Sequence, residues 1–320
     1  MGLKDKYESY FKIGTAVNIR TIKTHEELLR QHFNNITFEN EMKYSSVCRA
    51  PGEYNFTAAD RIYEFARENN MTVHGHCLVW HNQTPGFIFE NTTPDDLKET
   101  LREHIRRLGN RYGELAESWD VVNEGIEDKT DLFYRDTKWH RMYGDNYMDG
   151  MFMIAHEVLP GKKLFYNDYN ESIPEKREKI YQLVKGMKER GVPIDGIGLQ
   201  CHHNIYEPGV DGLKKAIERY AELGLRLRIT EMDISVFRFE DRTHLAEAPK
   251  ELMERQAELY EQYFELFREY HELIDAVTLW GPADDTTWLD NFPEPGRKNW
   301  PLLFDVNQEP KEAYHRVMNF

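Results

Sequence analysis

The segment Trp119-Asp120-Val121-Val122-Asn123-Glu124 combines a short β-branched run with two polar residues at its end. Short apolar runs of this kind are typical of strands that are buried inside a sheet. A glutamate that finishes such a strand is unfavourable unless it forms an ion pair or has a chemical use. The same pattern returns in Leu227-Arg228-Ile229-Thr230-Glu231. Both segments therefore predict a buried strand whose last residue lies in a functional site or in a structural ion pair.

Similar short runs recur along the whole chain and alternate with helical patterns. We predict eight strands, at residues 12–18, 35–39, 72–79, 118–123, 163–168, 196–201, 226–231 and 276–280. Strands that alternate with helices form βαβ units and a parallel sheet. Polar or aromatic residues follow each predicted strand, and a barrel brings the carboxyl ends of all its strands to one mouth. The sequence therefore predicts an α/β fold, a single (β/α)8 TIM barrel with its active site at that mouth.

No linker or low-complexity segment divides the 320 residues. An α/β barrel can reach about 250 residues or more as one domain. We therefore predict one catalytic domain over residues 1–320, without a carbohydrate-binding module.

Two helix starts are indicated by capping patterns. Thr93-Pro94 joins a capping residue to a proline at the first helical position. Ser172-Ile173-Pro174-Glu175 has the spacing of a capping box. We therefore predict that one helix is capped by Thr93 and another by Ser172.

The charge and the cysteines indicate the kind of partner and compartment. The net charge of -15, from 56 acidic and 41 basic residues, disfavours nucleic acid and anionic membranes as partners. No apolar run approaches the roughly 20 residues that span a bilayer. Cys48, Cys77 and Cys201 lack metal-site or redox spacing. Because the first ten residues (MGLKDKYESY) also lack an apolar signal segment, we expect a cytoplasmic protein with reduced thiols.

Two carboxyl groups at one barrel mouth point to glycoside hydrolysis. This reaction needs one carboxyl group that carries a proton and a second that stays ionised. Glu124 and Glu231 end the fourth and seventh predicted strands, so a barrel brings them together. Strand alternation predicts that Asp120 lies on the face opposite Asn123. The alternative for each glutamate is an ion pair with Arg or Lys.

Six longer motifs resemble one enzyme family. They are Thr37-Phe38-Glu39-Asn40-Glu41-Met42-Lys43, His74-Gly75-His76-Cys77-Leu78-Val79-Trp80-His81, Asp120 to Glu124, Gly196-Ile197-Gly198-Leu199-Gln200-Cys201-His202, Ile229-Thr230-Glu231-Met232-Asp233 and Thr278-Leu279-Trp280-Gly281. On these motifs, which run in order along nearly the whole chain, the sequence resembles glycoside hydrolase family 10. It is most similar to the family's intracellular bacterial xylanases.

The resemblance implies a retaining endo-β-1,4-xylanase that cleaves xylan or xylo-oligosaccharides without a cofactor or metal. It implies that Glu124 is the acid/base and that Glu231 is the nucleophile. Asn123 corresponds to a partner of the sugar 2-hydroxyl, Gln200 lies near the nucleophile, and His202 orients it. The remaining sugar-binding positions implied by the resemblance are Glu39, Asn40, Lys43, His76, Trp80, Trp280 and Trp288. The resemblance assigns no role to His203, and the sequence makes no prediction of the oligomeric state.

Three other functions are compatible with a barrel. A metal-dependent hydrolase would use His74 and His76 with His81 and His202, but the further ligands that such barrels carry on later strands are absent from the sequence. A sugar-binding barrel without catalysis would not need both glutamates. A glucan-cleaving enzyme would share the chemistry and differ in the loops that exclude the glucose hydroxymethyl group.

Overall fold

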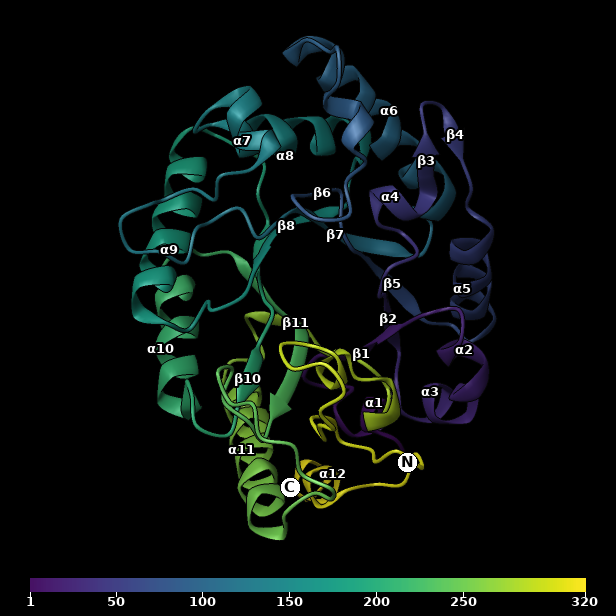
Figure 1. Ribbon diagram of the computed structural model, residues 1–320, viewed down its shortest axis with the longest axis vertical. Helices are drawn as coiled ribbons and strands as arrows, with labels where there is room; N and C mark the ends of the chain where they lie inside the picture. Colours follow the sequence, from purple (N-terminus) through teal and green to yellow (C-terminus); the bar gives the residue numbers. More distant parts are fainter.

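Eight parallel strands close into a ring at the centre of the computed structural model, which describes residues 1–320 (Figure 1). They are β1 (Lys12–Val17), β2 (Asn35–Phe38), β5 (Thr72–Gly75), β7 (Ala116–Asn123), β8 (Lys163–Asp168), β9 (Gly196–Leu199), β11 (Arg226–Ser235) and β12 (Ile274–Leu279). Each strand pairs in parallel with the next, and β12 pairs with β1. The predicted (β/α)8 barrel is confirmed.

Helices surround this ring on its outer side (Figure 1). The larger ones are α5 (Thr57–Glu68), α6 (Pro94–Tyr112), α8 (Tyr147–Val158), α9 (Pro174–Glu189), α10 (Gly209–Ala221) and α11 (Lys250–Glu269). The shorter ones are α1 (Leu3–Lys6), α2 (Thr21–Thr24), α3 (Glu26–His32), α4 (Tyr44–Val47), α7 (Lys138–Tyr143) and α12 (Glu312–Met318). Three 3-10 turns, Gly86–Phe89, Asp284–Thr286 and Trp288–Asp290, lie in connecting segments. None of the helices combines the length and the apolar character that crossing a bilayer requires.

Two of the predicted strands are interrupted. The run at 72–79 forms β5 and then β6 (Val79–Trp80), which pairs only with β7. The run at 196–201 forms β9, and β10 (His202–Asn204) follows it and pairs with β11. At the first break, a Cβ atom on Gly75 would lie 2.1 Å from Cε3 of Trp119. Glycine is therefore required where the indole of β7 covers the end of β5.

The two predicted helix starts have different outcomes. Thr93 caps α6, and its hydroxyl accepts a hydrogen bond from the amide of Asp96, as predicted. The predicted capping role of Ser172 is wrong, because α9 has Ile173 as its N-cap and no side-chain cap. The Ser172 hydroxyl donates instead to the carboxylate of Glu171, 3.2 Å away. A charge-assisted hydrogen bond of this kind is strong, and it orients the hydroxyl toward Glu171.

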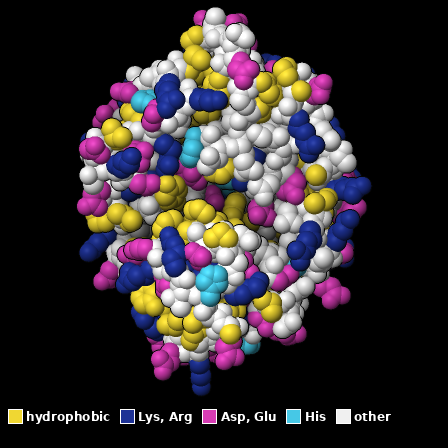
Figure 2. All heavy atoms as spheres, in the orientation of Figure 1, with side chains coloured by type: hydrophobic (Ala, Val, Ile, Leu, Met, Phe, Trp, Pro, Cys, Tyr) yellow, Lys and Arg dark blue, Asp and Glu magenta, His cyan; other side chains and the backbone are white.

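A single hydrophobic cluster joins the barrel to its helices. It contains 81 buried residues, which is the packing expected of one domain with one core. The face shown in Figure 2 is hollowed near its centre, and acidic and hydrophobic side chains surround the hollow. The carboxyl ends of the barrel strands supply the polar residues described next.

Candidate active site

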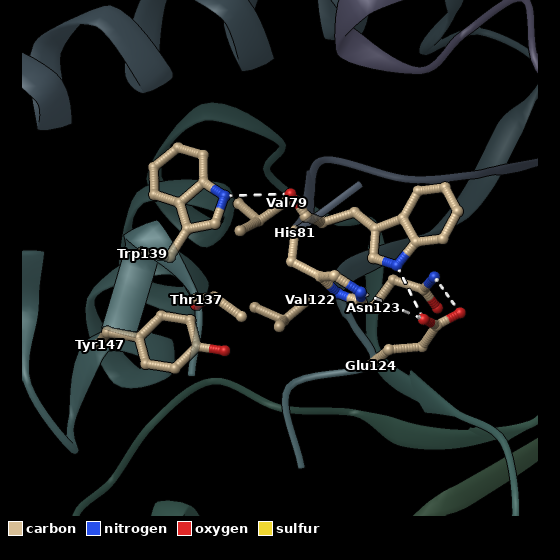
Figure 3. Close-up of a pocket in the computed structure, with 9 residues that line it drawn as sticks. Val79, His81, Val122, Asn123, Glu124, Thr137, Trp139 and Tyr147 are labelled. Carbon is tan, nitrogen blue, oxygen red and sulfur yellow. Dashed lines mark hydrogen bonds and ion pairs between the residues drawn. The ribbon is translucent and has the colours of Figure 1, made fainter. Parts of the chain in front are cut away.

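Glu124 follows directly after β7, and Figure 3 shows its carboxyl group beside the side chain of Asn123 and an indole N–H. Its Oε2 accepts a hydrogen bond from Trp80 Nε1 at 2.9 Å. Its Oε1 accepts from Asn123 Nδ2 at 3.1 Å and from Gln200 Nε2 at 3.2 Å. The pairing of β6 with β7 places Trp80 beside Asn123 and so accounts for the first of these contacts. Glu124 is partly exposed, so a substrate atom can reach its carboxyl group.

The backbone at Glu124 has a left-handed conformation, with φ of 58°. Residues other than glycine adopt this conformation rarely, so the surrounding contacts must hold it. The Tyr166 hydroxyl accepts hydrogen bonds from the amides of Gly125 and Ile126, at 3.1 and 3.0 Å. Arg135 Nε donates to the carbonyl of Glu124 at 3.0 Å. These contacts fix the direction in which the Glu124 side chain leaves the strand.

Glu231 lies within β11 and is buried. Its Oε1 accepts from Asn167 Nδ2 at 2.8 Å, and its Oε2 lies 3.2 Å from His202 Nε2. Burial alone would raise the pKa of Glu231, but the hydrogen bond from His202 and the charges of His76 and His202 hold it below its usual range. Glu231 is therefore a buried carboxylate that stays ionised.

His202 connects Glu231 to a second buried acid. Its Nδ1 lies 3.0 Å from Oδ2 of Asp233. Burial alone would lower the pKa of His202, but the charge of Asp233 and the hydrogen bonds to Asp233 and Glu231 raise it to about 10. The imidazole is therefore a cation that donates one N–H to each carboxylate.

The charge of His202 can be tested directly. We expect nuclear magnetic resonance of labelled imidazole nitrogens to show a protonated ring at about pH 8 and deprotonation near pH 10. Because the folded pKa lies above the ordinary value of 6.5, the contribution to stability is complete below that pH and is lost as the pH rises through about 10. Glu231→Gln removes one anionic partner and should lower the pKa of His202. A neutral ring at about pH 8 in the wild type would contradict this assignment.

An asparagine absent from the predicted site joins the two glutamates. Asn167 Nδ2 donates to Oε1 of Glu231 and to Oδ1 of Asn123, both at 2.8 Å. Thr230 Oγ1 donates to Asn167 Oδ1 at 2.7 Å and orients the amide. Since Asn123 also contacts Glu124, a continuous network links the two carboxylates. The sequence signal was the polar pair Asn167-Asp168 at the end of the fifth strand.

The predicted orientation of Asp120 is wrong. Asp120 lies inside the barrel, with its Oδ2 at 2.9 Å from His76 Nδ1 and its Oδ1 at 3.0 Å from His74 Nε2. The register of β7 against β8 shifts between Asp120 and Val122, so a bulge breaks the alternation. Burial would raise the pKa of Asp120, but His74 and His76 hold it well below its usual range. His76 Nδ1 also lies 4.0 Å from Glu231 Oε1, so Asp120 acts on the site through His76.

The other predicted sugar-binding residues surround this centre. Trp280 lies edge-on to His76, with ring centroids 5.4 Å apart, and Trp288 lies 5.0 Å from His202. Lys43 Nζ is 4.7 Å from the Trp80 ring and 3.4 Å from Asn40 Oδ1.

Glu39 is the exception among these predicted residues. Its carboxylate accepts a hydrogen bond from Asn18 Nδ2 at 2.8 Å and none from the other predicted residues. Asn18 directly follows β1, so this pair joins the ends of the first two strands.

His203 points away from this network. Its Nε2 lies 3.1 Å from Glu171 Oε1 and its Nδ1 lies 3.0 Å from the Tyr263 hydroxyl. Glu171, Cys201 and His203 form the one cluster of ligand-type side chains close enough together to hold a metal ion. Cys201 and His203 both contact Glu171 Oε1 within hydrogen-bond distance. The histidines named for a metal-dependent hydrolase do not converge with them, and His76 and His202 face carboxylates instead.

The glutamate pair, its network and the barrel agree with a known family. The family model described as Glycosyl hydrolase family 10 matches residues 2–320. The chain belongs to glycosyl hydrolase family 10. Among family 10 relatives, Endo-1,4-beta-xylanase A of Caldicellulosiruptor saccharolyticus is 50% identical, covering 100% of this chain and 96% of the relative. Endo-1,4-beta-xylanase B of Paenibacillus barcinonensis is 49% identical, covering 99% of this chain and 97% of the relative.

Two solved structures share the whole architecture of this chain. The endo-1,4-beta-xylanase from Caldicellulosiruptor owensensis superimposes with a TM-score of 0.98 at 50% identity, covering 100% of this chain and 99% of the other. A mutant solved in complex with xylotriose has a TM-score of 0.98 at 48% identity and covers both chains completely. This family 10 barrel is therefore similar to these structures over its full length.

Proposed function

We propose that this member of family 10 is a retaining endo-β-1,4-xylanase, with Glu231 as nucleophile and Glu124 as acid/base. The observation that carries the proposal is the pair of glutamates, Glu124 directly after β7 and Glu231 within β11, joined through Asn123, Gln200 and Asn167. The names of the curated relatives and the xylotriose bound to a similar structure support xylose-based chains as the substrate.

In the first step, Glu231 attacks the anomeric carbon and the glycosidic bond breaks. Its ionised state, maintained by His202, gives the oxygen the electron pair that forms the new bond. Glu124 transfers its proton to the departing glycosidic oxygen, so the shortened chain leaves as an alcohol. Asn123 lies between the two carboxylates, where its amide can bond the sugar 2-hydroxyl as positive charge develops on the ring.

In the second step, water replaces the enzyme at the anomeric carbon. Glu124, now ionised, takes a proton from the water, and the bond to Glu231 breaks. Two successive inversions leave the β-configuration unchanged. This double role explains why Glu124 is partly exposed while Glu231 is buried. General acid/base and nucleophilic carboxylates suffice for both steps, so the proposal requires no cofactor.

Aromatic rings and amides hold the sugar in this mechanism. Xylose has apolar ring faces and a fringe of hydroxyl groups, which match indole surfaces and hydrogen-bonding side chains respectively. The indoles are those of Trp80, Trp280 and Trp288, and the polar partners are Glu39, Asn40, Lys43, His76, Gln200 and His202.

A time course of xylohexaose digestion followed by proton nuclear magnetic resonance tests the proposal. We expect internal cleavage to shorter oligomers, with each new reducing end appearing first as the β-anomer. Initial release of the α-anomer would contradict the assignment of the two glutamates, because their proposed roles give retention. Absence of cleavage would exclude a xylanase, and parallel digestion of a β-1,4-glucan oligomer would then identify a glucanase or a barrel without catalysis.

The cytoplasmic location and the single-domain organisation over residues 1–320 stay predictions. Fractionation of cells of the source organism tests the first. Limited proteolysis tests the second, because one core should resist cleavage into separate folded parts.

A further inference from the structure

Trp288 is held between two other rings. On one side, the Phe292 ring stacks on it, with centroids 5.3 Å apart and an interplanar angle of 18°. On another side, the His202 ring lies 5.0 Å away. The indole Nε1 donates a hydrogen bond to Asp233 Oδ2 at 2.8 Å. This is the same oxygen that accepts from His202 Nδ1, so the position of Trp288 is coupled to the residue that orients Glu231.

Phe292 is supported from behind by a second exposed ring. Phe239 packs edge-on against it, with centroids 5.8 Å apart. Phe292 is 48% exposed and Phe239 is 61% exposed. Phenylalanines this exposed on neighbouring loops are unfavourable in water unless they have a function. The Phe292 and Phe239 rings thus form an aromatic row that runs from Trp288 toward solvent.

The two loops that carry these rings are tied together. Phe239 belongs to the segment between β11 and α11, and Phe292 follows the 3-10 turn Trp288–Asp290. The buried Arg297 donates to the carbonyl of Asp241 at 2.5 Å and lies over the Phe237 ring at 4.3 Å. Glu294 is paired with Arg242 and with His244. The stack therefore rests on two joined loops, one that follows β11, the strand of Glu231, and one that follows β12.

We propose that Phe292, supported by Phe239, is a positioning residue that holds Trp288 against His202 and Asp233 and thereby sets the affinity of the adjoining sugar subsite. This inference rests on the proposed xylanase function. Without the Phe292 ring, one face of the indole is open to water, and only the hydrogen bond to Asp233 and the contact with His202 remain. The Phe292 ring is linked to Glu231 only through Trp288, Asp233 and His202, so we expect its main effect on sugar binding and a small effect on the chemical step.

The test combines kinetics with a direct probe of Trp288. With an aryl β-xylobioside, Phe292→Ala should raise KM by about two- to tenfold, the range that one aromatic pair represents, while kcat changes by less than about twofold. Phe239→Ala should have a smaller effect in the same direction. Phe292→Tyr, which retains the stacked ring, should restore KM. Phe320→Ala is the matched control, since Phe320 is 44% exposed and packs on Tyr7 at the chain terminus.

The probe is the indole N–H proton resonance of Trp288, assigned by its loss in Trp288→Phe. We expect Phe292→Ala to shift this resonance and to speed its exchange with water, and Phe292→Tyr to leave it in place. An unchanged resonance would overturn the proposal. If KM rose with the resonance unchanged, Phe292 would contact sugar directly and the positioning role would be wrong. If the wild type failed to cleave the xylobioside, the proposed function would fail, and the resonance would still test the contact.

Discussion

Glu231→Ala is expected to reduce kcat by about 10⁴- to 10⁶-fold on every substrate, whatever its leaving group, as loss of a covalent nucleophile does in other hydrolases. Without this carboxylate no glycosyl-enzyme forms. The vacated space lies on the face from which Glu231 attacks, so a small anion can enter there. With added azide and an activated aryl xylobioside, we expect rescue by a single displacement that gives the α-glycosyl azide. A β-azide would show that another residue is the nucleophile.

A matched control separates catalysis from folding. Glu171 is a second fully buried glutamate, but it is bonded to His203 and lies outside the network of the two glutamates. Glu171→Gln should lower the melting temperature, because His203 loses a charged partner in a buried site. Its kcat should stay within a few-fold of the wild type. If Glu231→Ala and Glu171→Gln lost activity to the same degree, disruption of the barrel would explain both results.

Glu124→Ala should separate the two steps of the reaction. For xylo-oligosaccharides, whose leaving group needs a proton, we expect kcat/KM to fall by about 10²- to 10⁴-fold. For a dinitrophenyl xylobioside, whose leaving group needs none, the first step should be nearly unchanged. The second step is slow in this variant because the water lacks a base. We therefore expect a burst of dinitrophenolate followed by slow turnover.

The stereochemistry of azide rescue distinguishes this variant from the previous one. Azide attacks the glycosyl-enzyme of Glu124→Ala after one inversion has already occurred, so the product should be the β-glycosyl azide. The free indole N–H of Trp80 and amide of Gln200 remain to hold the substrate. If Glu124→Ala lost activity equally on the oligosaccharide and on the dinitrophenyl substrate, Glu124 would not be the acid/base.

The barrel and its two glutamates were predictable because both depend on local patterns. Alternating strands and helices indicate the fold, and the fold then brings the strand ends together whatever lies between them. Glu124 and Glu231 follow apolar runs, and both were predicted to end strands. Glu124 does follow β7 directly, whereas β11 continues past Glu231 to Ser235. The same reasoning placed Gln200 and Trp280, which also end strands.

The predictions that were wrong or incomplete concern contacts between different strands and helices. The orientation of Asp120 follows from a bulge against β8, and the alternation within one strand contains no information about its neighbour. The bridge through Asn167 requires side chains from β7, β8 and β11 to meet. Ser172 binds a carboxylate beside it instead of a helix amide. Each of these contacts depends on how elements pack in three dimensions, which spacing along the chain does not describe.

The closure of β12 onto β1 has a consequence for how the protein is made. A nascent chain that ends at residue 235 already holds both glutamates, but its sheet is open, with β1 and β11 as free edges. Only after Ile274–Leu279 emerges can the ring close, and the hydroxyl of Tyr7 then bonds the carbonyl of Val317. Contacts across such sequence distances form slowly, and unpaired edges invite aggregation in the meantime. Trp280 immediately follows β12. The late pairing of β12 with β1 therefore both closes the sheet and places the Trp280 indole in the site.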